Sequence, residues 1–171
     1  GLAVKGDVSK ADDMAALVDA AMAAHGRIDI FINNAGTTHL PQPMEDVEED
    51  EFDHALMVNT KSVYLSARHV VPVMKRQESG LILNIASTAG VSPRAGLSWY
   101  NASKGWMITA TKSMAVELAP HGIRVNALNP VAGETPMLKR FLGEDTPEMR
   151  AKFLATIPIG RFSTPQDLAS A

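Results

Sequence analysis

The sequence contains no cysteine, which excludes disulfide bonds and thiolate metal sites. A chain without cysteine is compatible with a reducing compartment, and we expect a cytoplasmic protein. The five histidines are spread along the chain without the spacing of metal ligands. We therefore predict that the protein holds no metal ion.

An excess of positive charge and long apolar runs are also missing. Sixteen Lys and Arg against nineteen Asp and Glu give a net charge of −3 at pH 7 and leave no basic stripe for nucleic acid. The longest apolar runs are far too short to cross a bilayer. We therefore expect neither nucleic acid nor membrane as a partner.

The length and composition fit one globular domain. With 171 residues, of which 46% are hydrophobic, the chain can bury a core of its own. It has no internal repeat, low-complexity tract or linker-like stretch. We therefore expect a single domain over residues 1–171.

Short apolar segments and helical patterns alternate along the chain. The segment 28–32 is apolar enough for a strand buried on both faces, while Ser9 with Asp12 has the spacing of a helix capping box. The alternation predicts an α/β fold with a doubly wound parallel sheet. The expected strands are 2–4, 28–32, 81–86 and 123–128, and the expected helices cover about 14–25, 49–74 and 99–118, with a last one opened by Thr164, Pro165 and Asp167.

Polar and glycine-containing turns follow each expected strand. Ligands of such sheets bind outside the carboxyl ends of the strands, so these turns should meet at one cleft. They comprise Asp7 and Val8, residues 33–36, Ser87, and residues 130–135.

Tyr100 and Lys104 have the spacing of an acid/base pair on a helix. Residues four apart share a helix face, so the Lys104 ammonium can stand beside the Tyr100 hydroxyl. A cation about 4 Å away at an effective dielectric of about 20 contributes about 4 kcal/mol, or roughly three pKa units. We therefore expect Lys104 to lower the pKa of Tyr100. With Ser87 at a strand end, the pair suggests a site for carbonyl reduction.

Taken together, these motifs resemble those of the short-chain dehydrogenase/reductase family. The matching blocks are Asp7-Val8, Asn33-Asn34-Ala35-Gly36, Val58-Asn59-Thr60, Ser87, Tyr100-Asn101-Ala102-Ser103-Lys104, and Asn129-Pro130 with Thr135. A lone Tyr-x-x-x-Lys is a weak signal, but the blocks in this order and spacing are strong. The resemblance implies a Rossmann-type domain that uses NAD or NADP to interconvert a secondary alcohol and a ketone.

The resemblance also implies a role for each matched residue. Tyr100 would be the acid/base, Ser87 would donate a hydrogen bond to the substrate oxygen, and Lys104 would hold the nicotinamide ribose. Asn59 would hold a water that links Lys104 to solvent, although it could also simply cap the helix it begins. Asn33 is expected to be structural. The expected cofactor-binding residues are Asp7, Val8, Asn34, Ala35, Gly36, Tyr100, Lys104, Pro130, Gly133 and Thr135.

The chain departs from the family pattern at its two ends. No glycine-rich turn for the pyrophosphate follows the first expected strand, and no strand follows the last expected helix. We therefore expect the intact polypeptide to have a strand-helix-strand unit before Gly1 and a strand after Ala171.

A further departure follows residue 129, where the family's Pro-Gly is replaced by Pro130-Val131 and the glycine stands at Gly133. The backbone contact to the nicotinamide carboxamide at Gly133 is then less fixed, because glycine moves more freely. Residues 135–160 are expected to form a flap over the substrate. The candidate pocket residues on this flap are Met137, Leu138, Phe141 and Phe153.

The helices expected over 59–77 and 99–118 carry apolar residues on more than one face. Similar family members use these helices between subunits, so we expect a homodimer or homotetramer; the alternative is that missing terminal segments cover these faces. Two other functions remain open. One is a catalytically silent NAD(P)-binding sensor, and the other is a nucleotide-sugar epimerase or dehydratase of the extended branch.

Overall fold

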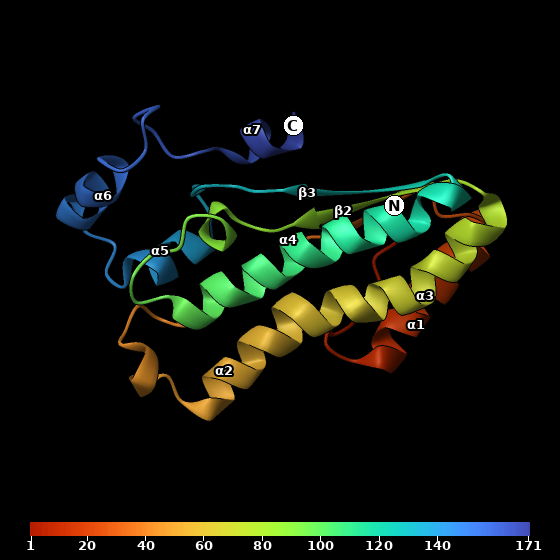
Figure 1. The fold of residues 1–171 in the computed structure, drawn as a ribbon, viewed down its shortest axis with the longest axis horizontal. Helices are drawn as coiled ribbons and strands as arrows, with labels where there is room; N and C mark the ends of the chain where they lie inside the picture. Colours follow the sequence, from red (N-terminus) through yellow and green to blue (C-terminus); the bar gives the residue numbers. More distant parts are fainter.

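The computed structural model describes residues 1–171, and Figure 1 shows its elements in chain order. The strands are β1 (Ile30–Asn33), β2 (Gly80–Ile85) and β3 (Ile123–Leu128). The helices are α1 (Ala11–His25), α2 (Glu49–Leu56), α3 (Ser62–Gln77), α4 (Ser98–Leu118), α5 (Pro136–Leu142), α6 (Pro147–Leu154) and α7 (Pro165–Ala169).

The three strands form one parallel sheet in the order β1-β2-β3, with Ile30 opposite Leu81 and Gly80 opposite Ile123. The predicted Rossmann-type α/β fold with a parallel sheet is confirmed. The strand expected at residues 2–4 is wrong, because this segment pairs with no other strand and stays exposed.

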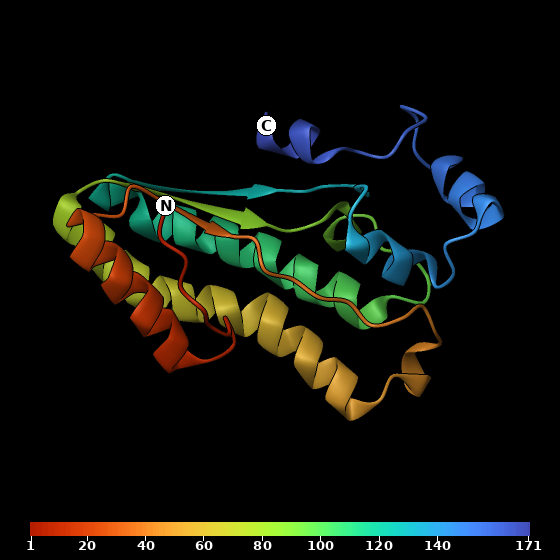
Figure 2. The ribbon, with the colours of Figure 1, turned by 180° about the vertical axis from the view of Figure 1, so that it is seen from behind.

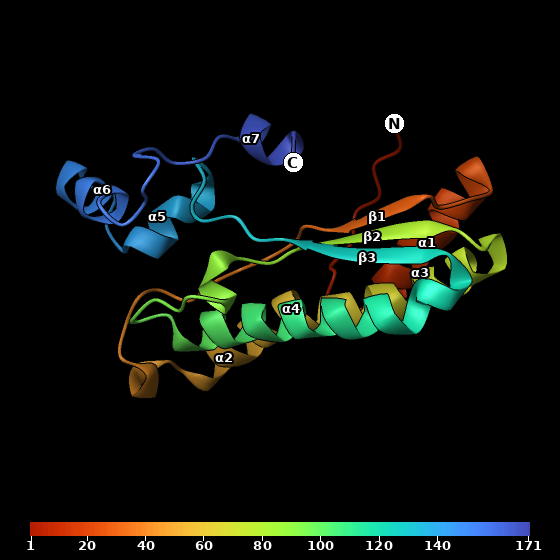
Figure 3. The same cartoon turned by 45° about the horizontal axis from the view of Figure 1, so that its top comes forward.

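Helices α1, α3 and α4 all lie on one side of this sheet, as Figures 2 and 3 show. The opposite face of β1 is open, so Ile30 and Ile32 are 59% and 52% exposed. The prediction that this strand is buried on both faces is therefore wrong for the described chain. No helix is both long and apolar enough to cross a membrane.

Residues 49–77 form one continuous helical segment, because a π-helical turn at Met57–Lys61 joins α2 to α3. Asn59 lies inside this turn and caps no helix, so the capping alternative is wrong. A π turn widens a helix locally and is often found at functional sites. Here it places the fully buried Asn59 side chain beside the loop after β1.

Two capping predictions had different outcomes. Thr164 and Asp167 form the capping box that begins α7, as the sequence indicates. Ser9 does not cap α1, whose N-cap residue is Lys10. The reason is competition, because both the backbone N–H and the hydroxyl of Ser9 donate to the Asp7 carboxylate.

The main core lies between the sheet and helices α1, α3 and α4. Full burial of an aliphatic side chain of this kind contributes about 1.5–3 kcal/mol, so this cluster fixes the helices on the sheet. Its members are Val18, Ile28, Val70, Val73, Met74, Ile82, Leu118, Ile123 and Val125.

Buried amides connect the carboxyl ends of two strands. Asn33 Nδ2 donates to Asn84 Oδ1 at 2.8 Å, and Asn84 Nδ2 donates to Thr111 Oγ1 at 2.8 Å. This chain ties β1 to β2 and to α4, so Asn33 has the structural role expected from the sequence. The same hydrogen bonds fix the ends of β1 and β2, after which the turns with the candidate site residues begin.

Candidate active site

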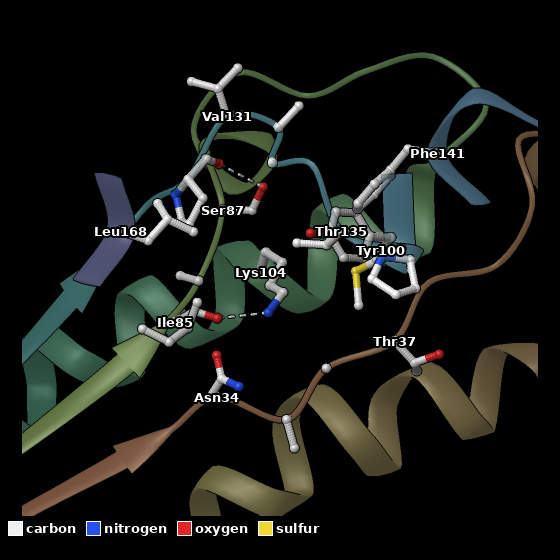
Figure 4. Close-up of a pocket in the computed structure, with 18 residues that line it drawn as sticks. Asn34, Thr37, Ile85, Ser87, Tyr100, Lys104, Val131, Thr135, Phe141 and Leu168 are labelled. Atoms are coloured by element: carbon white, nitrogen blue, oxygen red, sulfur yellow. Dashed lines mark hydrogen bonds between the residues drawn. The ribbon is translucent and has the colours of Figure 1, made fainter. Parts of the chain in front are cut away.

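A cavity of about 470 Å³ lies at the carboxyl ends of the strands (Figure 4). Its volume falls within the range of small-molecule sites. The predicted site residues on its wall are Asn34, Ala35, Gly36, Ser87, Tyr100, Lys104, Pro130, Gly133 and Thr135. The fold therefore brings together turns that are far apart in the sequence.

Asp7 and Val8 lie outside this cavity. They line a smaller cavity of about 120 Å³ near the start of α1, and Val8 also lines one of about 80 Å³ that reaches Asn34 and Ala35. The Asp7 backbone N–H donates to the Asp13 carboxylate at 2.7 Å, which fixes the turn. Val8 thus lies beside the predicted cofactor turn, whereas Asp7 lines only the smaller cavity near α1.

Lys104 is 4% exposed, and its ammonium group donates to the Ile85 carbonyl oxygen at 2.8 Å. Figure 4 shows this bond at the end of β2. The Lys104 Nζ atom lies 5.9 Å from the centre of the Tyr100 ring. Lys104 therefore stands on the face of Tyr100, as the four-residue spacing predicts, with its charge near the ring.

The predicted direction of the Tyr100 pKa shift is wrong for this structure. Burial raises the pKa of the Tyr100 hydroxyl, and the interaction with Ser87 only partly offsets this. Burial also lowers the pKa of Lys104 to about 8. The simple Coulomb argument leaves out the loss of hydration at both groups, and this loss has the larger effect here.

We expect the burial of Lys104 to be visible in the pH dependence of stability. Between its lowered pKa of about 8 and the ordinary lysine value of 10.5, the unfolded chain binds a proton that the folded chain does not. The free energy of unfolding should therefore rise with pH across this window. In Lys104→Met this contribution disappears, so urea titrations should show the stability of the wild type relative to the variant increasing with pH across this window. Parallel curves would contradict the assignment.

Ser87 begins the turn of residues 88–90, and its hydroxyl accepts a hydrogen bond from the Ala89 N–H at 3.1 Å. Its own contact to the Pro130 carbonyl oxygen is long, at 3.5 Å. The Ser87 hydroxyl therefore donates only a weak hydrogen bond within the protein. Ser87 thus combines the role of a turn cap with that of a donor facing the cavity.

The Asn59 amide holds the loop after β1 in place. Its Nδ2 donates to the Thr37 carbonyl oxygen and to Ser103 Oγ, and its Oδ1 accepts from the Thr37 N–H, each at 2.9 Å. Ser103 precedes Lys104 on α4. Asn59 therefore connects the loop, the π turn and the helix that carries Tyr100, immediately behind the cavity wall.

Gly36 lies close to the polar ends of two buried side chains. A Cβ atom at this position would lie 3.4 Å from Lys104 Nζ and 3.5 Å from Asn59 Oδ1. Its absence leaves the polar atoms of both side chains open toward the turn. The turn therefore places small residues and the Lys104 ammonium group together on the cavity wall.

Gly133 is more firmly held than its residue type suggests. It forms a parallel bridge with Ser163, whose N–H and hydroxyl both donate to the Ala132 carbonyl oxygen. Backbone hydrogen bonds therefore flank Gly133, while its contact to the nicotinamide carboxamide stays a prediction. This bridge fixes the segment from Pro130 to Thr135 against the chain that leads into α7.

The segment 135–160 contains α5 and α6, and two of its four candidate residues reach the cavity. Met137 and Phe141 line it, and the Phe141 ring stacks edge-to-face on Tyr100 at 5.1 Å. Leu138 and Phe153 instead pack in a separate apolar cluster of this segment.

Sequence reasoning missed three contributors to the site. The Ile85 carbonyl oxygen binds Lys104, while Thr37 and Ser103 hold the Asn59 amide. A backbone carbonyl carries no sequence signal. The position of Ser103 inside the matched Tyr100–Lys104 block was the available indication for that residue.

Comparisons with known proteins agree with this geometry. The family model described as enoyl-(acyl carrier protein) reductase matches residues 1–171. The 4-formylbenzenesulfonate dehydrogenase TsaC1/TsaC2 of Comamonas testosteroni is 53% identical over 166 residues, which are 96% of this chain and 66% of that protein. The chain thus spans about two thirds of the length of such relatives.

Two solved structures are also similar. The 3-ketoacyl-(acyl-carrier-protein) reductase of Brucella melitensis, complexed with NADH, has a TM-score of 0.93 and 49% identity, covering 99% of this chain and 68% of that one. A gluconate 5-dehydrogenase of Burkholderia cenocepacia, in complex with NADP and tartrate, has a TM-score of 0.89 and 31% identity, covering 96% and 64%. With a family match over its whole length and these relatives, the chain belongs to the short-chain dehydrogenase/reductase family.

Proposed function

We propose that the protein is an NAD(P)-dependent oxidoreductase that interconverts a secondary alcohol or related hydroxyl compound and its carbonyl form. The observation that carries this proposal is the grouping of Ser87, Tyr100 and Lys104 on the wall of one cavity at the strand ends. Relatives named as dehydrogenases and reductases support it.

The cofactor would be NAD or NADP, since similar structures hold NADH and NADP. When bound, the cofactor supplies hydride to the carbonyl carbon. Lys104 would hold its ribose, and Gly36 leaves the space for its close approach. The other proposed contacts are Asn34, Ala35, Pro130, Gly133 and Thr135 from the cavity wall, with Asp7 and Val8 toward the adenosine half.

The protein's own groups complete the reduction by placing a proton on the carbonyl oxygen. Tyr100 donates this proton, and Ser87 donates a hydrogen bond to the same oxygen, where negative charge develops. Lys104 then supports the return of the proton to Tyr100, and Asn59 positions the helix and loop around it. In oxidation of an alcohol the same proton moves in the opposite direction.

The proposed substrates are small carbonyl compounds or their alcohols. The relatives named above act, by name, on an aryl aldehyde sulfonate, a 3-ketoacyl thioester and gluconate. In this chain Met137, Phe141 and Val131 give the substrate side of the cavity an apolar wall. A 3-oxoacyl thioester, a sugar or a small hydrophobic ketone all suit this chemistry.

We also propose that the protein forms a homodimer or homotetramer through α3 and α4 and works in the cytoplasm. Tyr64, Trp106 and Val116 on these helices are 52%, 44% and 79% exposed, so both helices present apolar side chains that a second copy of the chain could cover. Light scattering of the intact protein at micromolar concentration should give the mass of a dimer or tetramer. A monomer would contradict the proposed assembly.

The proposed activity is tested by following oxidation of NADH and of NADPH by the intact protein with aldehydes, ketones and 3-oxoacyl thioesters. We expect turnover of at least one carbonyl class with a preference for one cofactor. Cofactor binding without turnover of any carbonyl compound would favour a silent sensor. Turnover of nucleotide sugars without net cofactor oxidation would favour an epimerase.

A further inference from the structure

Arg94 connects the loop before Tyr100 with helix α6. Its backbone carbonyl accepts a hydrogen bond from Asn101 Nδ2 at 2.8 Å, so the loop is fixed to α4. Its guanidinium group lies 4.0 Å from the centre of the Phe153 ring. Both terminal nitrogens reach the hydroxyl of Thr156 at 3.3 Å. The side chain therefore extends from the loop before α4 to Thr156, just after the end of α6.

The charge of Arg94 has no counter-charge in the structure. Arg27, Arg150 and Arg161 pair with carboxylates at 3.1 Å or less, and none of the other arginines forms a salt bridge. Among these, Arg94 is the one whose guanidinium group contacts the neutral Thr156 hydroxyl and the Phe153 ring. Burial lowers the pKa of the Arg94 guanidinium from its ordinary value. The Arg94 guanidinium is partly desolvated and donates only two long hydrogen bonds, both to one neutral oxygen. It can therefore still form charge-assisted hydrogen bonds with an anion.

Arg94 belongs to the same part of the molecule as the substrate side of the cavity. Leu97, three residues later, packs with Tyr100 and with Phe141, which lines the cavity. On the other side, Phe153 packs against the cluster that contains Ala132, also on the cavity wall. Figures 1 and 2 show this loop and helices α5 and α6 gathered at one end of the molecule.

The cavity itself presents no carboxylate that would repel an anion. Its lining holds one charged side chain, Lys104, and no Asp or Glu. Lys104 already donates a hydrogen bond to the Ile85 carbonyl oxygen and lies at the end of the cavity where Tyr100 would act on the substrate carbonyl. Arg94 is not part of this lining; it lies beside the cavity, on the loop whose Leu97 packs with Phe141.

We propose that Arg94 selects substrates that carry a carboxylate or sulfonate group away from the reacting carbonyl. The inference rests on the proposed oxidoreductase function and specifies its substrate class. A guanidinium group presents two parallel N–H donors, which match two oxygens of such an anion. The anion would take the place of the Thr156 hydroxyl, while the ring of Phe153 keeps the guanidinium plane in position.

The test compares two anionic probes, 4-formylbenzenesulfonate and 4-formylbenzoate, with the neutral 4-formylbenzenesulfonamide. We expect Arg94→Gln to raise KM for both anions by about 10- to 100-fold, the range of a charge-assisted hydrogen bond, with little change in kcat. The neutral probe should keep its KM within about 3-fold, and Arg94→Lys should recover part of the anion binding. A loss with one anion alone shows which oxyanion the site takes.

Two variants serve as controls. Thr156→Val removes the neutral partner of Arg94 but keeps its charge, so KM for the anions should stay the same or fall. Arg140→Gln removes one positive charge from an exposed position on α5 and should leave all three probes unchanged. An equal rise of KM for neutral and anionic probes in Arg94→Gln would overturn the proposal. Arg94 would then have only the structural role of holding its loop against Thr156.

Failure of the proposed activity can be separated from failure of this inference. If no carbonyl compound is turned over, calorimetric titration of the intact protein with 4-formylbenzenesulfonate still tests Arg94. Binding by the wild type that is lost in Arg94→Gln supports the anion site, whereas no binding, or equal binding by both proteins, overturns it.

Discussion

Replacing Tyr100 with phenylalanine should lower kcat by about 10²- to 10⁴-fold, the usual contribution of a positioned acid/base group. Tyr100 lines the cavity together with Ser87 and Lys104, and its ring packs on Phe141. Phenylalanine keeps this packing and removes only the proton donor. Cofactor affinity should therefore change little, as measured by quenching of protein fluorescence during cofactor titration.

The raised pKa of Tyr100 sets the direction of the pH dependence. Because burial favours the neutral hydroxyl, Tyr100 holds its proton at neutral pH and can donate it to a carbonyl oxygen. The rate of carbonyl reduction should thus be constant at low and neutral pH and fall as the pH rises through the pKa of Tyr100.

Tyr64 provides a matched control, since it is the other of the two tyrosines. It is 52% exposed on α3, and its hydroxyl accepts only from Arg68 at 3.2 Å. Tyr64→Phe should retain full activity. Equal kcat values for the wild type and Tyr100→Phe would exclude Tyr100 as the acid/base.

A methyl group at Gly90 should both destabilise the protein and abolish most of its activity. A Cβ atom there would lie 2.7 Å from the Gly105 nitrogen and 2.7 Å from the Lys104 carbonyl carbon, which are backbone atoms of α4. Such overpacking costs about 1–3 kcal/mol, because the turn or the helix must shift. The turn carries Ser87 and the helix carries Tyr100 and Lys104, so the shift also separates the three groups that we propose to be catalytic.

Substitution of Gly105, which faces Gly90 from α4, should raise the stability of the protein instead of lowering it. A Cβ atom at Gly105 would lie 3.5 Å from the Gly90 carbonyl oxygen, an ordinary contact. Since Gly105 lies inside α4, alanine should stabilise the protein by about 0.5–1 kcal/mol. Urea unfolding should give midpoints on opposite sides of the wild type, and a Gly90→Ala protein of unchanged stability would contradict the close packing.

Local patterns in the sequence were sufficient to place most elements. The helix expected at 99–118 is α4 (Ser98–Leu118), and the strand expected at 81–86 is β2 within one residue. Both depend on periodic apolar residues that pack in the core. The segment 2–4 is equally apolar, but a strand also needs a neighbour to bond with, and composition does not report this.

The candidate site was predictable where side chains carry the signal. Ser87, Tyr100 and Lys104 line one cavity because strand ends meet at one edge of a parallel sheet. Burial and backbone contacts were not predictable in this way. The Ile85 carbonyl oxygen that binds Lys104 has no residue signature, and the upward shift of the Tyr100 pKa depends on how deeply the folded chain buries it.

The most direct test of the account is transfer of deuterium to a carbonyl substrate from reduced cofactor that carries deuterium at both hydrogen positions of the reactive nicotinamide carbon, followed by mass spectrometry of the alcohol product. We predict one deuterium per product molecule with the wild-type protein and almost no product with Tyr100→Phe, although both bind the cofactor. Product without deuterium, or equal labelled product from both proteins, would contradict hydride transfer assisted by Tyr100.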